Sequence, residues 1–427
     1  MIKIIKDKLS NRDEIFATVG KVADVSVAVS EIIEKVRREG DAALYYYTEK
    51  FDKATLDSLR VNEEEIERAK AAVEPRFIEI LESAAENIRQ FHKAQRNEGF
   101  RITKENGVVV GQKVVPVDTA GLYVPGGTAA YPSTVLMDAI PAKIAGCPRV
   151  VMVTPPDKNG NVNPVILAAA SVAGVDEIYK VGGAQAIAAL AYGTETIPKT
   201  DKIVGPGNAY VAEAKKQVFG KVSIDMIAGP SEIMIIADGT NNARHIAADL
   251  LSQAEHDRMA SAVLVTDSEE LANAVSLELE RQIPTLERSE IARASIDNNG
   301  KIIITESLDS AVEIANGIAP EHLEISVDNP FVYLDKIRHA GSVFLGKNCP
   351  EALGDYLAGT NHTLPTSGTA KFSSPLSVDD FVKKTQYIYY DRGALGAVCR
   401  DVEFFANKEG LTAHARSAVI RFEDENE

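Results

Sequence analysis

Short apolar runs rich in valine and isoleucine recur along the chain and alternate with stretches of helical periodicity. In Met137–Ala145 and Ala184–Tyr192, apolar side chains return at spacings of three and four residues, which indicates helices. The strand-like runs are Arg149–Val153, Glu177–Val181, Asp201–Val204, Glu232–Ile236, Ala262–Val265, Lys301–Ile304 and Ser342–Leu345. Strands alternating with helices predict parallel sheets covered by helices on both faces. The pattern is long enough for two such units, and we expect the turn Gly229–Glu232 to cross between them.

The segments on either side of this region have a different character. Val25–Arg38 and Arg76–Gln95 each carry a helical apolar stripe with charged residues on the other side. Beyond Leu345 the chain is loop-rich, and it continues with an expected helix near Val378–Lys384, a strand-like YIYY stretch and a helix near Val402–Lys408. This last segment is too short for an independent domain. We expect an arm that packs elsewhere on the protein or on a second subunit.

Charge and cysteine content limit the partners and the compartment of this protein. The chain has 427 residues, which predicts more than one domain, and its net charge of −16 makes nucleic acid and anionic membranes poor candidates as partners. Cys147, Cys349 and Cys399 are too few and too scattered for a disulfide framework. The charged N-terminus is unlike a secretory signal, and the apolar stretch Val165–Val175 falls short of the roughly 20 residues that span a bilayer. We therefore expect a soluble, cytoplasmic protein.

Glycine-rich turns recur between strand-like and helical runs, at Tyr123–Ser133, Val181–Ala186 and Val204–Tyr210. Backbone N–H groups at such helix N-termini attract phosphates and other anions. The last turn lacks the third glycine of the dinucleotide fingerprint G-x-G-x-x-G, because Tyr210 stands in its place. Ordinary turns that need glycine are the alternative. Because these turns recur on successive strands, a nucleotide pocket at the carboxyl ends of the strands is as well supported as that alternative.

The segment Leu250–Asp257 (LLSQAEHD) ends a helix with a pair of polar side chains. Gln253 and His256 are three residues apart, so both project from one side of the last turn. An amide oxygen beside an imidazole nitrogen is half of a mixed oxygen and nitrogen metal site. The spacing alone favours a simpler interpretation, a helix C-terminus with a histidine and a solvated glutamine. Asp355 and His414 are the best candidates to complete a metal site.

Glu321 and His322 are adjacent in the segment APEHLEI. A carboxylate beside an imidazole can divide acid and base work between two steps. The alternative is a helix that begins after Pro320 with a charged first turn. Several histidines lie in polar segments beside Gln, Glu, Asp or Thr, which suggests a shared site. They are His256, His322, His362 and His414.

Longer strings, spread over nearly the whole chain, resemble the histidinol dehydrogenase family. These are GLYVPGGTAAYPSTVLM, VGGAQAIAALAYGTETIP, VGPGNAYVAEAKKQV, DMIAGPSEI, LLSQAEHD, APEHLEI, GDYLAGTNHTLPT and EGLTAHARS. The resemblance implies oxidation of L-histidinol to L-histidine through L-histidinal, with two NAD reduced, at the end of histidine biosynthesis. It also implies one zinc ion per subunit and a homodimer with shared active sites.

The resemblance implies roles for residues at the matching positions. Glu321 and His322 would be the catalytic acid/base pair. The Zn²⁺ ligands would be Gln253, His256, Asp355 and, from the partner subunit, His414. The residues in contact with NAD would be Tyr123, Gln185 and Asn208. The substrate site would be lined by Ser231, Gln253, His256, His322, Asp355, His362, Glu409 and His414, with Glu409 also from the partner.

The implied fold is a pair of incomplete Rossmann-like domains, doubly wound and mainly parallel α/β, similar to aldehyde dehydrogenases. The expected boundaries are 20–124 plus 232–372 for the first domain, 125–231 for the NAD-contacting domain, 1–19 for an N-terminal segment, and 373–427 for an arm on the partner subunit. Competing classes are an aldehyde dehydrogenase with Cys349 as nucleophile, a zinc hydrolase, and a non-catalytic metal-binding scaffold. The absence of H-E-x-x-H from the sequence argues against the hydrolase.

Overall fold

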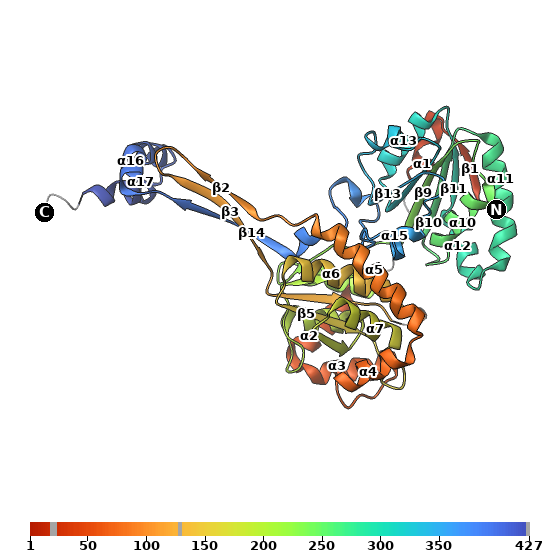
Figure 1. Ribbon diagram of the computed structural model, residues 1–427, viewed down its shortest axis with the longest axis horizontal. Coiled ribbons are helices and arrows are strands. Elements are labelled where there is room, and N and C mark those ends of the chain that lie inside the picture. Colours follow the sequence, from red (N-terminus) through yellow and green to blue (C-terminus); the bar gives the residue numbers. More distant parts are fainter. Residues whose placement is uncertain (18–23, 127–129, 424–427) are drawn as a thin grey trace. The chain divides into compact units, whose positions relative to one another are not determined.

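The computed structural model describes residues 1–17, 24–126 and 130–423. The chain forms two compact units (Figure 1), which we call unit 1, comprising Met1–Gln95 and Val117–Phe381, and unit 2, comprising Arg96–Pro116 and Val382–Glu427. Among the described helices, none is long and apolar enough to cross a membrane. Of the expected site residues, Glu409 and His414 belong to unit 2 and the others to unit 1.

A five-stranded parallel sheet in unit 1 has the strand order β6-β5-β4-β7-β8. Its strands are β4 (Thr119–Tyr123), β5 (Arg149–Thr154), β6 (Glu177–Lys180), β7 (Lys202–Val204) and β8 (Ser223–Ile224). Successive side chains enter different cores, with Leu122 on one face and Tyr123 on the other. Both faces are therefore apolar and need a cover of helices.

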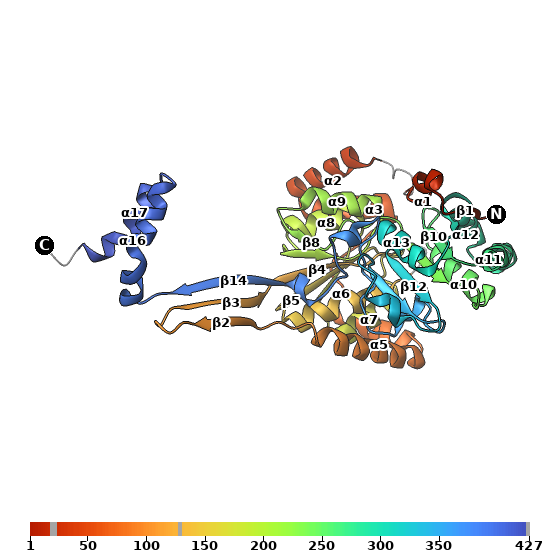
Figure 2. The ribbon, with the colours of Figure 1, turned by 90° about the horizontal axis from the view of Figure 1, so that it is seen from above.

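Helices cover both faces of the five-stranded sheet (Figure 2). One face carries α4 (Glu63–Ala72), α5 (Pro75–Lys93), α6 (Pro132–Ala145) and α7 (Pro164–Ala173). The other carries α2 (Ser26–Glu39), α3 (Asp41–Asp52), α8 (Gly183–Tyr192) and α9 (Ala209–Val218). Polar caps fix several of these starts: Asn62 forms a capping box at α4, and the Asn208 side chain accepts from the backbone of α9.

A six-stranded parallel sheet forms the rest of the unit 1 framework, in the order β1-β11-β10-β9-β12-β13. Its strands are β1 (Lys3–Lys6), β9 (Glu232–Ala237), β10 (Ser261–Thr266), β11 (Lys301–Ile304), β12 (His322–Ser326) and β13 (Ser342–Leu345). One face packs on α10 (Ala243–Ala254), α11 (Glu269–Gln282) and α12 (Ser289–Asn299). The other packs on α1 (Arg12–Ile15) and α13 (Leu308–Ile318), and the short helices α14 (Phe331–Leu334) and α15 (Ala352–Tyr356) follow in the chain.

The two sheets repeat one topology. Starting from β4 in one sheet and β9 in the other, two strands are added on one side and two on the opposite side, and in the six-stranded sheet the N-terminal β1 is a further edge strand beside β11. This is the 3-2-1-4-5 order of a Rossmann sheet that lacks its sixth strand, with switch points between β4 and β7 and between β9 and β12. The expected class, a pair of incomplete, doubly wound parallel α/β sheets, is confirmed.

Unit 2 is an antiparallel sheet, β14-β3-β2, followed by two helices. The elements are β2 (Gly99–Thr103), β3 (Val109–Pro116), β14 (Val382–Tyr389), α16 (Arg392–Lys408) and α17 (Thr412–Val419). The helix expected near Val378–Lys384 is wrong: Val378–Phe381 is one 3₁₀ turn, and from Val382 the chain pairs along the whole of β3. The helix expected near Val402–Lys408 is the last part of the longer α16.

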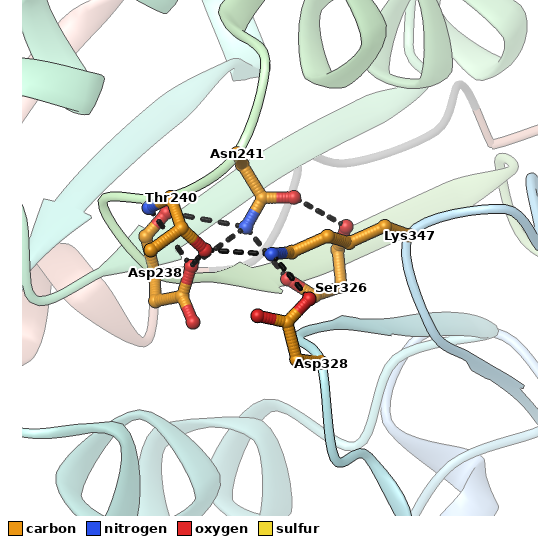
Figure 3. A network of polar contacts seen from close by, with 6 residues as sticks. All are labelled: Asp238, Thr240, Asn241, Ser326, Asp328 and Lys347. Atoms are coloured by element: carbon orange, nitrogen blue, oxygen red, sulfur yellow. Dashed lines mark hydrogen bonds and ion pairs between the residues drawn. The ribbon is translucent and has the colours of Figure 1, made fainter.

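Polar side chains fill the switch point at the carboxyl edge of the six-stranded sheet (Figure 3). They follow β9, β12 and β13 and comprise Asp238, Thr240, Asn241, Ser326, Asp328 and Lys347. The Asn241 amide donates to the Ser326 carbonyl at 2.7 Å and accepts from the Ser326 hydroxyl at 2.7 Å. Lys347 Nζ donates to Thr240 Oγ1 and Asp328 Oδ1, each at 2.6 Å. These groups satisfy one another's hydrogen-bonding capacity, so they form a structural tie that links the ends of the strands.

Replacing Asn241 by alanine is expected to lower the free energy of unfolding by about 1–3 kcal/mol, because it leaves the Ser326 carbonyl and hydroxyl without their partner. Urea unfolding measures the loss. Asn273→Ala is the matched control, since that exposed amide donates only to a carbonyl one turn earlier in its own helix. Equal stability of the two variants would contradict a tie at this edge.

Candidate active site

The amino edge of the six-stranded sheet and the carboxyl edge of the five-stranded sheet border one cavity of about 670 Å³. Its lining includes Asn208 after β7, Ser231 before β9 and Glu321 before β12. His256, just past α10, and His362 also line it. Residues expected at the substrate, metal and NAD sites on sequence grounds therefore share one cavity within unit 1.

Glu321 and His322 sit at the start of β12, which lies between β9 and β13 in the sheet. Both side chains are buried. His322 Nδ1 is 3.0 Å from the Glu232 carbonyl oxygen, while Glu321 Oε2 accepts from the Glu232 backbone N–H at 2.8 Å. A carbonyl can only accept, so Nδ1 carries the proton and Nε2 keeps the lone pair. Nε2 is buried and has no hydrogen-bond partner among the described residues.

Burial sets the protonation of this pair. Burial lowers the pKa of His322 below its usual 6.5, which keeps the imidazole neutral and able to accept a proton. Burial raises the pKa of Glu321 well above its usual 4.5, and the neighbouring Glu232 carboxylate adds to the rise. A carboxyl group of high pKa is a stronger base once ionised than a solvent-exposed glutamate.

The Gln253 side chain is held by Glu351, a residue that the sequence analysis missed. Gln253 Nε2 donates to Glu351 Oε1 at 2.5 Å, and Ser252 Oγ donates to Glu351 Oε2 at 2.7 Å. With its amide nitrogen turned to Glu351, Gln253 directs its carbonyl oxygen elsewhere, as a metal ligand would. Glu351 lies four residues before Asp355, a spacing that places both on one side of α15 and could have identified it.

Asp355 is the centre of the polar cluster. One ligand atom from each of His322, Glu351 and Asp355 lies within 4.8 Å of the others, close enough to hold one metal ion. Asp355 Oδ1 is 3.5 Å from His362 Nδ1, and His362 Nε2 is 3.3 Å from Thr134 Oγ1. Burial acts to raise the pKa of Asp355, but bonding to and attraction by His362 outweigh it and lower that pKa to about 2. Burial lowers the pKa of His256, and the Asp355 charge opposes this effect without reversing it, so the neutral imidazole that a metal needs is favoured.

The donor set at this cluster suits a divalent ion. An amide oxygen, imidazole nitrogens and a carboxylate oxygen are the ligands of mixed zinc or manganese sites. Burial, with the adjacent Asp355 charge, raises the pKa of Glu351 to about 8, which shows how much negative charge is confined here. The residues present therefore fit the zinc that the resemblance implies.

The remaining expected substrate and metal residues lie in different places. Ser231 precedes β9, where its carbonyl accepts from the Ser261 backbone, and it lines the cavity. Glu409 follows the last residue of α16 and His414 lies in α17, both exposed on unit 2. Ser231 therefore joins the unit 1 cluster, while Glu409 and His414 are described only within their own unit.

The expected NAD residues line a second cavity of about 560 Å³. Tyr123 ends β4, Gln185 is in the first turn of α8, and Asn208 caps α9. The Tyr123 hydroxyl accepts from the Gly183 backbone at 3.1 Å. Gly205 has φ +113° and a Cβ there would lie 2.1 Å from the Tyr123 carbonyl oxygen, so this turn requires glycine. In the turn Tyr123–Ser133, residues 127–129 lie outside the described part of the chain.

Comparisons with known proteins agree on one family. The family model described as histidinol dehydrogenase matches residues 17–422. Histidinol dehydrogenase of Clostridium acetobutylicum is 56% identical over 427 residues, covering 99% of each chain, and that of Bacillus cereus is 58% identical over 397 residues, covering 93% of this chain and 92% of the relative. The crystal structure of histidinol dehydrogenase from Elizabethkingia anophelis has a TM-score of 0.95 at 40% identity and covers 100% of this chain and 99% of that one.

Proposed function

This chain belongs to the histidinol dehydrogenase family, and from that premise we propose that it oxidises L-histidinol to L-histidine through L-histidinal, the last steps of histidine biosynthesis. The alcohol loses two electrons to give the aldehyde, water adds to give the hydrate, and the hydrate loses two more to give the acid. NAD, when bound, accepts the hydride in each oxidation, so two NAD are reduced per histidine. Tyr123, Gln185 and Asn208 are the proposed contacts with this cofactor.

His322 is the proposed base for the alcohol proton. The observation that carries this proposal is its buried Nε2, whose lone pair is free because Nδ1 donates to the Glu232 carbonyl. A buried polar atom without a partner costs stability, so its persistence is best explained by a ligand that pairs with it. Nε2 would accept the hydroxyl proton as hydride leaves the carbinol carbon of histidinol.

Glu321 is the proposed base for hydration of the aldehyde. Its raised pKa supports this role, because an ionised Glu321 would take a proton readily from an attacking water. The Glu232 N–H that donates to Glu321 Oε2 holds the carboxylate in place. Because the group is buried beside His322, the aldehyde would be hydrated where it forms, which prevents its escape.

One zinc ion per subunit is the proposed anchor for the substrate, held by Gln253, His256 and Asp355 of one chain and by His414 of a partner chain. When bound, the ion would fix the imidazole and amino nitrogens of histidinol and give some Lewis-acid help. The Glu351 bond that orients the Gln253 amide supports this ligand set. Ser231, His362 and the partner's Glu409 would complete the substrate site.

A homodimer with shared sites is supported by the surface of unit 2. Its buried apolar cluster is small, namely Cys399, Ala418 and Val419. Many large apolar side chains of this unit are exposed in the single chain: Phe100, Ile102, Tyr387, Ile388, Tyr389, Val402, Phe404, Phe405 and Leu411. So large an apolar surface on so small a unit marks an interaction site. We propose that residues 373–427 form an arm on the partner subunit.

Removing the metal tests the proposed function. After treatment with a chelator, NADH formation from histidinol and NAD is expected to fall about 100-fold or more, and added Zn²⁺ should restore it, because the anchor contributes several kcal/mol to the transition state. NAD binding should survive, since Tyr123 and Gln185 line a separate cavity. Full activity in protein shown by elemental analysis to be metal-free would overturn the proposal. Normal turnover by Cys349→Ser would exclude a thiol-dependent aldehyde dehydrogenase.

A further inference from the structure

The two cavities described above share one lining residue. Asn208 lines both the cavity that holds Glu321 and His256 and the cavity that holds Tyr123 and Gln185. A dinucleotide with its reactive ring near the acid/base pair would pass Asn208 at the N-terminus of α9, where the helix dipole favours a pyrophosphate. The other half of the molecule, the adenosine, would then occupy the second cavity.

One acidic side chain in the second cavity has no assigned role. Asp52 is the last residue of α3 and lines this cavity beside Tyr123. Burial raises the pKa of the Tyr123 hydroxyl, and the Asp52 charge adds to the rise. Asp52 Oδ2 is buried and has no hydrogen-bond partner among the described residues. The cavity is lined on the same side by Tyr47 and Phe51, whose rings stack at 5.5 Å. A buried carboxylate oxygen without a donor is costly, and its position indicates that a ligand supplies the donor.

We propose that Asp52 accepts hydrogen bonds from the hydroxyl groups of the adenosine ribose and thereby selects NAD over NADP. This inference rests on the proposed function, because it takes NAD as the ligand of this cavity. A vicinal diol offers two O–H donors to the two oxygens of a carboxylate, whereas an adenine amine offers one nitrogen. In NADP a 2′-phosphate replaces one hydroxyl, which removes a donor and sets two anions against each other.

The position of Asp52 explains how the cofactor can be recognised without the usual fingerprint. In a complete Rossmann unit the ribose carboxylate follows the G-x-G-x-x-G turn by about 20 residues. Here it comes from a helix that precedes the whole five-stranded sheet and packs on its face. The sequence motif is therefore absent while the chemistry it serves is retained.

Binding of ADP-ribose, which lacks the nicotinamide and cannot turn over, tests the proposal directly. Asp52→Asn is expected to raise the dissociation constant by about tenfold or more by isothermal titration calorimetry, because a charge-assisted pair is lost. In steady-state assays the preference for NAD over NADP, as a ratio of kcat/KM values, should fall by a similar factor. Asp57→Asn, an exposed residue five positions further on, is the matched control and should change neither.

The outcomes separate this inference from the proposed function. Wild-type oxidation of histidinol with NAD, together with unchanged ADP-ribose binding and NADP preference in Asp52→Asn, would overturn the role of Asp52 alone. Loss of ADP-ribose binding in that variant would support Asp52 even if histidinol were not the substrate. If the wild type instead rejected nicotinamide hypoxanthine dinucleotide and Asp52→Asn restored it, Asp52 would contact the adenine amine and the ribose assignment would be wrong.

A stability measurement excludes a merely structural role for Asp52. Burial raises its pKa to about 6 from 3.8, so the folded chain binds this proton more tightly than the unfolded chain. The group therefore favours folding most below pH 3.8 and loses that contribution as the pH rises through 6, with Glu31 and Lys50 as the other charged groups lining the cavity. At pH 8 the Asp52→Asn variant should be at least as stable as the wild type. A clear loss of stability would contradict a ligand-binding role.

Discussion

The His322→Asn variant is expected to oxidise histidinol with a kcat about 10² to 10⁴-fold below that of the wild type, the contribution of a positioned general base. Asparagine is chosen because its amide nitrogen can still donate to the Glu232 carbonyl, as His322 Nδ1 does at 3.0 Å, while nothing replaces the basic Nε2. The fold at the start of β12 should therefore be kept. Initial rates of NADH formation at saturating histidinol and NAD measure the loss.

The pH dependence distinguishes a lost base from a disturbed fold. Burial holds the pKa of His322 below 6.5, so wild-type kcat should fall as the pH is lowered through this pKa, whereas the variant, which lacks the base, should lose that dependence. His245→Asn is the control, because His245 is exposed near the first turn of α10, away from the Gln253 end of that helix. A kcat for His322→Asn within a few-fold of the control would show that another group accepts the alcohol proton.

Periodicity in the sequence predicted most of the parallel strands of unit 1, but it missed β1 and β8 as well as β12. The predicted strands Lys301–Ile304 and Ser342–Leu345 coincide with β11 and β13, because both are short apolar runs rich in β-branched or aromatic residues. β12 reads HLEIS and all five residues are buried. The polar residues of this segment suggested exposure, because polar residues usually lie at the surface, but here His322 and Glu324 are buried within the strand.

The error at Val378–Lys384 has a different cause. The segment VKKTQYIY of β14 is largely exposed and owes its strand conformation to antiparallel pairing with β3, more than 250 residues earlier. Strand preference depends on such partners more than on local sequence, so only the YIYY stretch at the end of β14 was recognised as strand-like and its first residues were assigned to a helix.

The proposed acid/base pair and the proposed metal ligands of unit 1 were expected from motifs, whereas their supporting residues were not. Gln253 and His256 are residue types that can bind a metal, but their spacing alone favoured a simple helix end, and the resemblance of LLSQAEHD to the family gave them a metal-binding role. Glu351 lies outside the quoted motifs, and Glu324 lies inside APEHLEI but was given no role; Glu324 Oε1 accepts from the Glu351 backbone N–H, and Glu351 orients Gln253. Glu324 is two residues beyond His322 and thus faces the same side of β12. Only the strand assignment reveals this shared face, so missing β12 also hid the support of the site.

Mixed dimers that combine His322→Asn and His414→Ala chains are expected to regain activity that neither variant has alone. If the arm of each chain serves the other chain's site, one site of a mixed dimer receives an intact His322 from one chain and an intact His414 from the other. The second site carries both substitutions and should be inactive. In a symmetric dimer each doubly tagged, purified mixed species should therefore show about half of the wild-type activity, and unselected mixtures about a quarter.

The physical basis of this expectation is the exposed state of His414. In the single chain both His414 and Glu409 are exposed on unit 2, whereas Gln253 is buried and His256 and Asp355 are partly buried in unit 1. Three of the four proposed ligands therefore belong to unit 1 and the fourth to unit 2. A ligand from a second chain makes the metal site conditional on dimerisation, so dilution below the dimer dissociation constant should also release zinc. Co-expression with two affinity tags isolates the mixed dimers, and each variant purified with itself sets the background. Confirmed mixed dimers that remain at background activity would show that His414 acts within its own chain or not at all.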